Sequence, residues 1–177
     1  LDQQAAMILE LVPEAKTVGM LYCSAEPNSE YQVNVVTEAL KELNPDLEIK
    51  NYTFADSNDI SSVATSATEC DVVYIPTDNT AANNTEAINN VMEPAGVPVI
   101  AGEAGICQGC GVATLSISYY DLGYTTGEMA YEILEEGADI STMEVQYAPN
   151  VTKQYMADRC EKLGITVPDD YEAIEAE

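Results

Sequence analysis

The sequence predicts an α/β fold, in which a parallel β-sheet is flanked by helices on both faces. Short apolar runs typical of buried strands alternate with segments whose apolar residues repeat at helical spacing. Several of these runs lead directly into a polar loop before a helix begins, and the run from Val72 to Ile75 is the clearest. The chain has 177 residues, of which 46% are hydrophobic, which is enough for one domain with a substantial core.

A helix is expected over residues 1–12, because its apolar side chains fall on one face and Pro13 cannot continue its hydrogen bonds. The apolar run 17–22 is the first strand. A polar loop follows it and leads to a second helix, which Asn28 or Ser29 caps. That helix is expected to end near Leu43, before Asn44-Pro45. The next expected elements are a strand over 47–55, a polar loop over 56–59 and a short helix over 60–67.

The strand 72–75 is followed by Pro76 and four small polar residues, and then by a helix that ends near Ala95. The helix expected over 119–136 is strongly periodic, and Gly137 closes it. Residues 1–168 are therefore expected to form one domain, and the acidic residues 169–177 a frayed tail. The other expected elements are strands over 96–101 and 112–118, an extended segment over 143–147 and a helix over 153–163.

The charge of the chain excludes several functions. Its 31 acidic and 6 basic residues give a net charge of −25, and it has no histidine. Nucleic acids and anionic membranes are therefore poor partners. Without histidine, Ser-His-Asp and Cys-His catalysis and His-bearing zinc sites are excluded. We expect a binding protein, not an enzyme, with no cofactor and no metal.

The sequence shows neither a membrane span nor a signal peptide. No apolar run reaches the ~18 residues that a spanning helix needs. The residues from Leu1 onward have the pattern of a helix and not of a signal peptide. We therefore expect either that the chain stays where it is made or that the start of a longer protein is missing.

Five cysteines leave at least one thiol unpaired. Cys107 and Cys110 form a Cys-Gln-Gly-Cys motif in what reads as a glycine-rich loop. Plain thiols are the simplest interpretation, with a local disulfide as the main alternative and a redox pair or half a metal site after it. No second pair of this kind is present, and no basic residue lies nearby in the sequence to lower a thiol pKa.

Polar loops follow four of the expected strands, and the exits of parallel strands meet at one edge of a sheet. None of these loops carries a nucleophile beside a base or a glycine-rich phosphate loop. Helix starts near Ser29 and Thr80 suit a carboxylate, whereas Glu26, Asp78 and Glu103 suit an ammonium group. Together with a wall of tyrosines at positions 22, 119 and 120, these groups complement an amino-acid zwitterion. The same polar residues are also ordinary helix caps, and this alternative stays open.

Five stretches of the chain occur in an order that resembles a known family. They are Leu11-Val12-Pro13-Glu14-Ala15-Lys16-Thr17-Val18-Gly19, Glu26-Pro27-Asn28-Ser29, Pro76-Thr77-Asp78-Asn79-Thr80, Ala113 to Tyr124 followed by Thr126-Gly127, and Lys162 to Pro168. Together they resemble the C-terminal lobe of type 1 ABC-transporter substrate-binding proteins of the tryptophan/tyrosine type. One departure is Ile106-Cys107-Gln108-Gly109-Cys110, where a plain glycine-rich loop is expected.

The resemblance implies a type 1 periplasmic-binding-protein lobe that binds an amino acid, aromatic by the type of the family, and delivers it to an ABC permease. It also implies an extracytoplasmic location for the full-length protein, as a cell-surface lipoprotein or in the periplasm. The ligand would lie between two lobes, and only the second lobe is present here. The helix over 119–136 would then cross to the missing N-terminal lobe or pack against a second copy in a homodimer.

The resemblance also implies a set of ligand-binding residues. Those on strand-exit loops that line the family's cleft are Ser29, Thr77, Asp78, Asn79, Thr80 and Glu103. Others on the first of these loops are Ser24, Glu26 and Asn28, and those near the crossing between lobes are Ser118, Tyr119 and Asp121. The competing interpretation is a flavodoxin-like or receiver-like signalling or redox domain, which shares the order of strands and helices.

Overall fold

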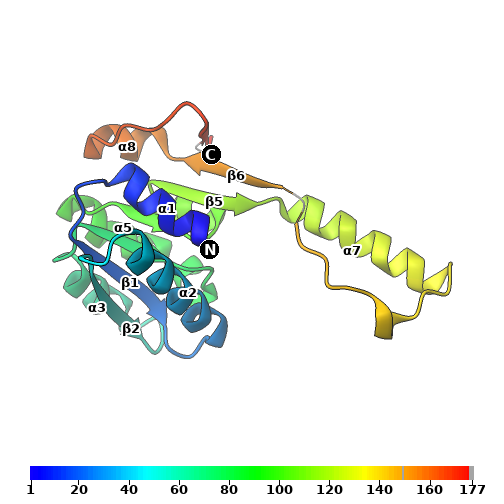
Figure 1. Ribbon diagram of the computed structural model, residues 1–177. Coiled ribbons are helices and arrows are strands. Elements are labelled where there is room, and N and C mark those ends of the chain that lie inside the picture. Colours follow the sequence, from blue (N-terminus) through cyan, green and yellow to red (C-terminus); the bar gives the residue numbers. More distant parts are fainter. Residues whose placement is uncertain (149, 176–177) are drawn as a thin grey trace. The chain divides into compact units, whose positions relative to one another are not determined.

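A computed structural model describes residues 1–148 and 150–175 of the chain (Figure 1). The chain divides into two compact units. The first unit contains Leu1–Leu115 and Lys153–Glu177, and the second contains Ser116–Thr152. The single domain expected over residues 1–168 includes residues of both units.

The described residues form a seven-stranded sheet in the order β2-β1-β3-β4-β5-β6-β7. The strands are β1 (Thr17–Cys23), β2 (Glu48–Phe54), β3 (Val72–Ile75), β4 (Val99–Ala101), β5 (Ala113–Ile117), β6 (Val151–Tyr155) and β7 (Glu172–Ala173). Strands β1 to β5 pair in parallel, and β6 pairs in parallel with β7. The predicted α/β fold is thus confirmed. The order reverses between β1 and β3, which is where open α/β sheets place their ligands.

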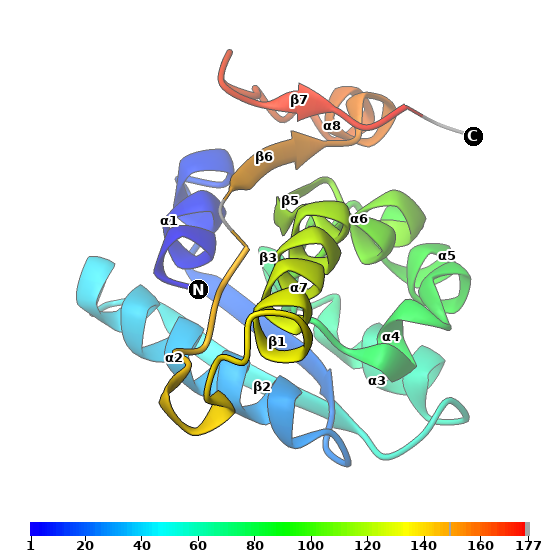
Figure 2. The ribbon, with the colours of Figure 1, turned by 90° about the vertical axis from the view of Figure 1, so that its right-hand side faces the viewer.

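Helices cover both faces of the sheet in the first unit (Figure 2). They are α1 (Asp2–Leu11), α2 (Pro27–Leu43), α3 (Ile60–Ala67), α4 (Asn79–Ala82), α5 (Thr85–Ala95), α6 (Ala104–Cys110) and α8 (Ala157–Leu163). Buried residues of α1 and α2 form one apolar cluster, and those of α3 to α6 form a second. The two clusters lie on opposite faces of the sheet, because successive side chains of a strand point to opposite faces. In β3, Val72 and Tyr74 join the first cluster, whereas Val73 and Ile75 join the second.

The end of the first unit differs from the sequence prediction. We expected a helix from residue 153, but residues 151–155 form β6 and α8 begins at Ala157. The polar residues Lys153 and Gln154 hid this strand. The tail expected to be frayed contains β7, and Tyr171 lies in the first apolar cluster with 7% of its surface exposed. A buried tyrosine therefore ties the segment that leads into β7 to the core.

The second unit consists of helix α7 (Tyr119–Leu134), a 3-10 turn η1 (Ile140–Thr142) and a segment that folds back along the helix (Figure 1). No described residue of α7 is buried. Leu122, Met129 and Ile133 are half-buried, whereas Tyr124 and Tyr131 are 61% and 59% exposed. The segment 143–147, expected to be extended, joins no strand. The helix therefore has a tyrosine-rich face without a partner in the described chain.

No helix among the described residues is both long and apolar enough to cross a lipid bilayer.

Candidate functional site

The loops that follow β1 and β3 are joined by one carboxylate. Glu26 accepts hydrogen bonds from the backbone N–H groups of Asn79 and Thr80 at 3.0 and 2.9 Å. It also accepts from the side chains of the same two residues, at 2.9 and 2.8 Å. Partial burial by itself raises the pKa of Glu26, but these four hydrogen bonds outweigh it and lower the pKa to about 2. Glu26 therefore caps the amino end of α4 from the neighbouring loop.

Asp78 makes a second link between the same two loops. It is 1% exposed, and its carboxylate accepts from Cys23 N at the end of β1 and from Ala81 N in α4, both at 2.8 Å. A buried carboxylate with two backbone donors is a structural cap. The ordinary-cap interpretation of Asp78 is thus the one that its contacts fit.

Thr77 connects the exits of three neighbouring elements. Its carbonyl accepts from Asn28 Nδ2 at 3.0 Å, and its N–H donates to Gln32 Oε1 at 3.0 Å. Its hydroxyl donates to the carbonyl of Gly102, after β4, at 3.4 Å. A Cβ atom at Gly102 would lie 2.5 Å from Thr77 N and 2.6 Å from Pro76 C. Only glycine lets the two exits approach so closely.

Glu103 caps the amino end of α6. Its carboxylate accepts from Gly105 N at 2.9 Å through one oxygen and from Ile106 N through the other. The side chain is only half-buried. Each oxygen keeps a second acceptor position, since an ionised carboxylate offers about four. Glu103 is thus both a cap and an available acceptor.

Ser29 and Ser24 differ in what they offer to a ligand. We expected Asn28 or Ser29 to cap α2, but the helix begins at Pro27 with Glu26 as its N-cap. Ser29 lies in the first turn, is fully buried, and its Oγ has no hydrogen-bond partner among the described residues. Ser24 is exposed, and its hydroxyl donates to the carbonyl of Phe54 at 3.3 Å.

Ser118, Tyr119 and Asp121 belong to the second unit. Within it, Ser118 is the N-cap of α7, and its Oγ accepts from Asp121 N at 3.1 Å. Tyr119 is 58% exposed. Asp121 is half-buried in the first turn, where an acidic residue complements the helix dipole.

Cys107 and Cys110 lie on α6 and not in a loop, which corrects the prediction for this motif. Both thiols are free and buried, so the possible disulfide is not formed. Burial raises the pKa of Cys107 far above the ordinary value and that of Cys110 to about 12. Among residues 1–148 and 150–175, no cluster of three or more His, Cys, Asp or Glu side chains could hold a metal ion.

The polar residues after β1, β3 and β4 therefore share one edge of the sheet, which we call the rim. It consists of Ser24, Glu26, Asn28, Thr77, Asp78, Asn79, Thr80, Gly102 and Glu103. Two residues that support the rim, Gln32 and Gly102, were not predicted from the sequence. The position of Gly102 directly after an apolar run was a signal for close backbone approach, whereas Gln32 had none. The rim offers carboxylates, amides and hydroxyls without a nucleophile and base pair, as a binding surface does.

Comparison with known proteins places the chain in a family. The chain belongs to the ABC transporter substrate binding proteins, whose family description matches residues 1–176. This family binds its ligands without transforming them, which agrees with the prediction of a non-enzyme. The resemblance inferred from the sequence motifs is thus confirmed. The flavodoxin-like or receiver-like alternative is set aside.

Three relatives illustrate the match. A tyrosine-binding protein of Clostridioides difficile (strain R20291) is 31% identical over 136 residues, which are 76% of this chain and 39% of that protein. An ABC domain from Streptococcus pneumonia in complex with L-Trp is 28% identical with a TM-score of 0.85, and the match covers 95% of this chain and 56% of that one.

A ligand-free, open substrate binding protein with adhesive properties from Clostridium difficile is also 28% identical, with a TM-score of 0.79. The match covers all of this chain and 60% of that one. The chain thus spans about half of the length of these relatives, as one lobe of such a protein does.

Proposed function

We propose that this chain is one lobe of the solute-binding component of an ABC importer and that it binds an aromatic amino acid at the rim. The observation that carries the proposal is the convergence of the β1, β3 and β4 exits at the point where the strand order reverses. Support comes from relatives that are named for tyrosine binding or were solved with L-Trp.

Among the rim carboxylates, Glu103 is our choice to hold the ammonium group of the ligand. Glu26 receives four donors, which fill its acceptor positions, and Asp78 is 1% exposed. Glu103 keeps one acceptor position on each oxygen and is half-buried. Glu26 and Asp78 then hold the loops in place and do not bind the ligand.

The carboxylate of the ligand is assigned to the amino end of α2. This helix has 17 residues, and Asn28 lies in its first turn, at the positive end of the helix dipole. Ser24, Asn28 and Asn79 are exposed, and Thr77 is half-buried, so their polar groups are accessible at the rim. Ser29 is fully buried and would reach the ligand only after a local rearrangement.

The tyrosine-rich face of α7 is proposed to pack against a missing N-terminal lobe or against a second copy. Leaving several large residues exposed is unfavourable, at about 1.5–3 kcal/mol for each one that could be fully buried. The length of the relatives, to which this chain contributes about half, favours the missing lobe. Ser118, Tyr119 and Asp121 would then lie near the crossing between lobes.

The family assignment extends the proposal to location and partners. Substrate-binding proteins of ABC importers work outside the cytoplasm, and we propose the same for the full-length protein, as a cell-surface lipoprotein or in the periplasm. An ABC permease is the proposed partner. The net charge of −25 makes nucleic acid an unsuitable one.

Amide chemical shifts measured by NMR during titration with L-tryptophan and L-tyrosine test the ligand site. One lobe offers only part of the contact surface, so we expect weak binding, on the order of millimolar. Shifts should concentrate at Thr77, Asn79 and Glu103. Tryptamine lacks the carboxylate and indole-3-propionate lacks the ammonium group, so each should bind at least about tenfold more weakly.

Glu103→Gln is the matched variant, with Glu86→Gln, an exposed residue in the first turn of α5, as its control. Glu103→Gln should weaken binding of L-tryptophan but leave binding of indole-3-propionate unchanged. Shifts confined to another edge of the sheet would contradict the proposal. An equal loss of affinity for L-tryptophan and indole-3-propionate in Glu103→Gln would also contradict it.

A further inference from the structure

The chain passes between the two compact units at two points. Helix α1, which belongs to the first unit, contacts the residue of that unit next to each of these points. The first unit ends at Leu115 in β5 and resumes at Lys153 in β6. Gln4 bonds to the first of these residues and Glu10 to the second. All of these contacts lie inside the first unit.

At the outgoing crossing, Gln4 ties β5 to β3 and to Gly102, the residue after β4. Its side-chain Nε2 donates to the carbonyls of Leu115 and Gly102 at 3.3 and 3.2 Å. Its Oε1 accepts from the hydroxyl of Tyr74 at 2.9 Å. Gln4 is 6% exposed and Tyr74 is fully buried. Buried polar groups are costly to leave unpaired, so this amide holds Leu115, the middle residue of β5, firmly.

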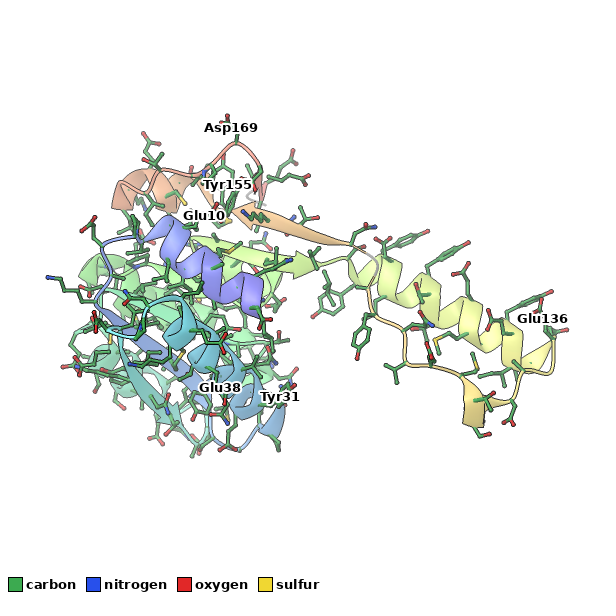
Figure 3. The ribbon with its side chains drawn as sticks, viewed as in Figure 1. Glu10, Tyr31, Glu38, Glu136, Tyr155 and Asp169 are labelled. Atoms are coloured by element: carbon green, nitrogen blue, oxygen red, sulfur yellow. The ribbon has the colours of Figure 1, made fainter. Side chains whose placement is uncertain are left out.

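At the returning crossing, Lys153 is held by several groups together. Its Nζ lies 3.0 Å from Glu10 Oε2 and 2.9 Å from Asp170 Oδ2. It also lies 4.9 Å from the ring centroid of Tyr171. The hydroxyl of Tyr171 donates to Glu10 at 2.7 Å, and this tyrosine is 7% exposed. Glu10 is labelled on α1 in Figure 3.

A network of this kind fixes the position of a side chain more strongly than a single ion pair does. An exposed ion pair contributes little, because solvent screens it. Here the ammonium of Lys153 has two carboxylates and an aromatic face, and the aromatic ring is itself fixed in the core. Lys153, the middle residue of β6, is thus anchored to α1 and to Asp170 and Tyr171.

We propose that Gln4 and Glu10 are positioning residues that anchor both crossings to α1 and thereby limit motion between the two units. We call Gln4, Glu10, Leu115 and Lys153 the α1 clamp. Bending is then confined to residues beyond Leu115 and before Lys153. The inference rests on the proposed function, because a lobe that closes on a ligand needs a defined hinge.

Hydrogen exchange measured by mass spectrometry tests the local part of the inference. Gln4→Leu should speed exchange of residues 113–117 roughly tenfold, which is the effect of about one lost hydrogen bond. Lys153→Met should do the same for residues 151–155. Exchange of β1 and β2 should stay as in the wild type in both variants.

Two controls match these substitutions. Gln3→Leu makes the same change at an exposed neighbour on α1. Lys162→Met removes an exposed lysine whose Nζ lies 2.6 Å from Glu93. Neither should change exchange at the crossings. If Gln4→Leu does not fold, Gln4→Met, which keeps the length of the side chain but removes its amide, replaces it for residues 113–117. Glu10→Gln is the second variant for residues 151–155, since it removes the ion pair but still offers an oxygen to Tyr171.

Double electron–electron resonance tests the effect on motion. Spin labels at Glu42→Cys on α2 and Glu128→Cys on α7 report the distance between units, and both positions are exposed. The five native cysteines are buried and should stay unlabelled. The clamp variants should broaden the distance distribution, whereas Gln3→Leu and Lys162→Met should leave its width unchanged.

The inference is overturned if exchange at both crossings matches the wild type. It is equally overturned if exchange rises but the distance distribution keeps its width, since the contacts then stabilise strands without limiting motion. Neither measurement contains a ligand. A failure of the clamp is therefore distinguishable from a failure of amino-acid binding, which the titration with L-tryptophan tests separately.

Discussion

Replacing Glu26 by glutamine should uncouple the β1 and β3 exits at the rim. Glutamine keeps one side-chain oxygen as an acceptor. In place of the second carboxylate oxygen it has an NH₂ group, which cannot accept the hydrogen bonds that this oxygen accepts in the wild type. Each oxygen of Glu26 serves one backbone N–H and one side chain. The substitution therefore leaves at least one backbone N–H at the start of α4 without its partner.

The expected loss follows from the pKa of Glu26. A folded-state pKa of about 2, against an ordinary value of 4.5, corresponds to about 3 kcal/mol without screening. Glu26 is only partly buried, so we discount this figure by about half, to ~1.5 kcal/mol. One or two lost charge-assisted hydrogen bonds give a similar number.

The dependence on pH has a definite sign. The pKa of Glu26 is lowered on folding, so its contribution is present above about pH 4.5 and is lost as the pH falls towards 2. Near neutral pH, the free energy of unfolding of the wild type should exceed that of Glu26→Gln by ~1.5 kcal/mol. This difference in stability should narrow below about pH 4.5.

Urea unfolding followed by far-ultraviolet circular dichroism measures this difference at several pH values. Glu38→Gln is the control and should change stability by less than about 0.5 kcal/mol. Glu38 is an exposed residue of α2, the helix that Glu26 precedes, and is labelled in Figure 3. A difference between wild type and Glu26→Gln that stays constant from neutral pH to pH 2.5 would refute the reasoning.

Three other predictions concern packing, capping and thiol chemistry. Gly102→Ala should destabilise the protein by about 1–3 kcal/mol in urea unfolding and weaken L-tryptophan binding, because its Cβ would meet the backbone at Thr77; Gly127→Ala, with open space around it, should not destabilise. Arg159→Met should cost about 2–4 kcal/mol by the same assay, because its guanidinium donates to the carbonyls of Cys107, Gln108, Gly109 and Gly111 at the end of α6, and Arg159→Lys should restore only part of the loss. Wild-type stability in Gly102→Ala or in Arg159→Met would contradict the importance of these contacts. A thiol reagent should leave all five cysteines unreacted in the native protein and modify all five after denaturation, since burial keeps them inaccessible; rapid reaction at Cys107 or Cys110 in the native state would show that α6 opens.

The sequence predicted the fold because strand and helix periods are local signals. The apolar run Val72–Ile75, with a polar loop directly after it, was sufficient to place a buried strand and its exit. The convergence of the exits followed from the parallel sheet alone. The strand β6 was missed, since Lys153 and Gln154 interrupt any apolar alternation.

The roles of the rim acids could not be predicted, because helix caps and ligand-binding groups use the same residue types. Glu26, Asp78 and Glu103 looked equivalent in the sequence. Their differences depend on how many donors reach each carboxylate in the folded chain. Gln4 was missed for a related reason, since glutamine in an amphipathic pattern normally faces solvent, whereas this one lies at 6% exposure.

The hydrogen bonds that the acidic side chains of the rim accept have a consequence for an approaching anion. Glu26 and Glu103 each accept from backbone N–H groups at the amino end of a helix, α4 and α6, so part of their negative potential is offset close to its source. A strongly acidic protein thereby keeps one small region where a negatively charged group meets little repulsion. Uptake of a zwitterion at this region should consequently vary little with ionic strength.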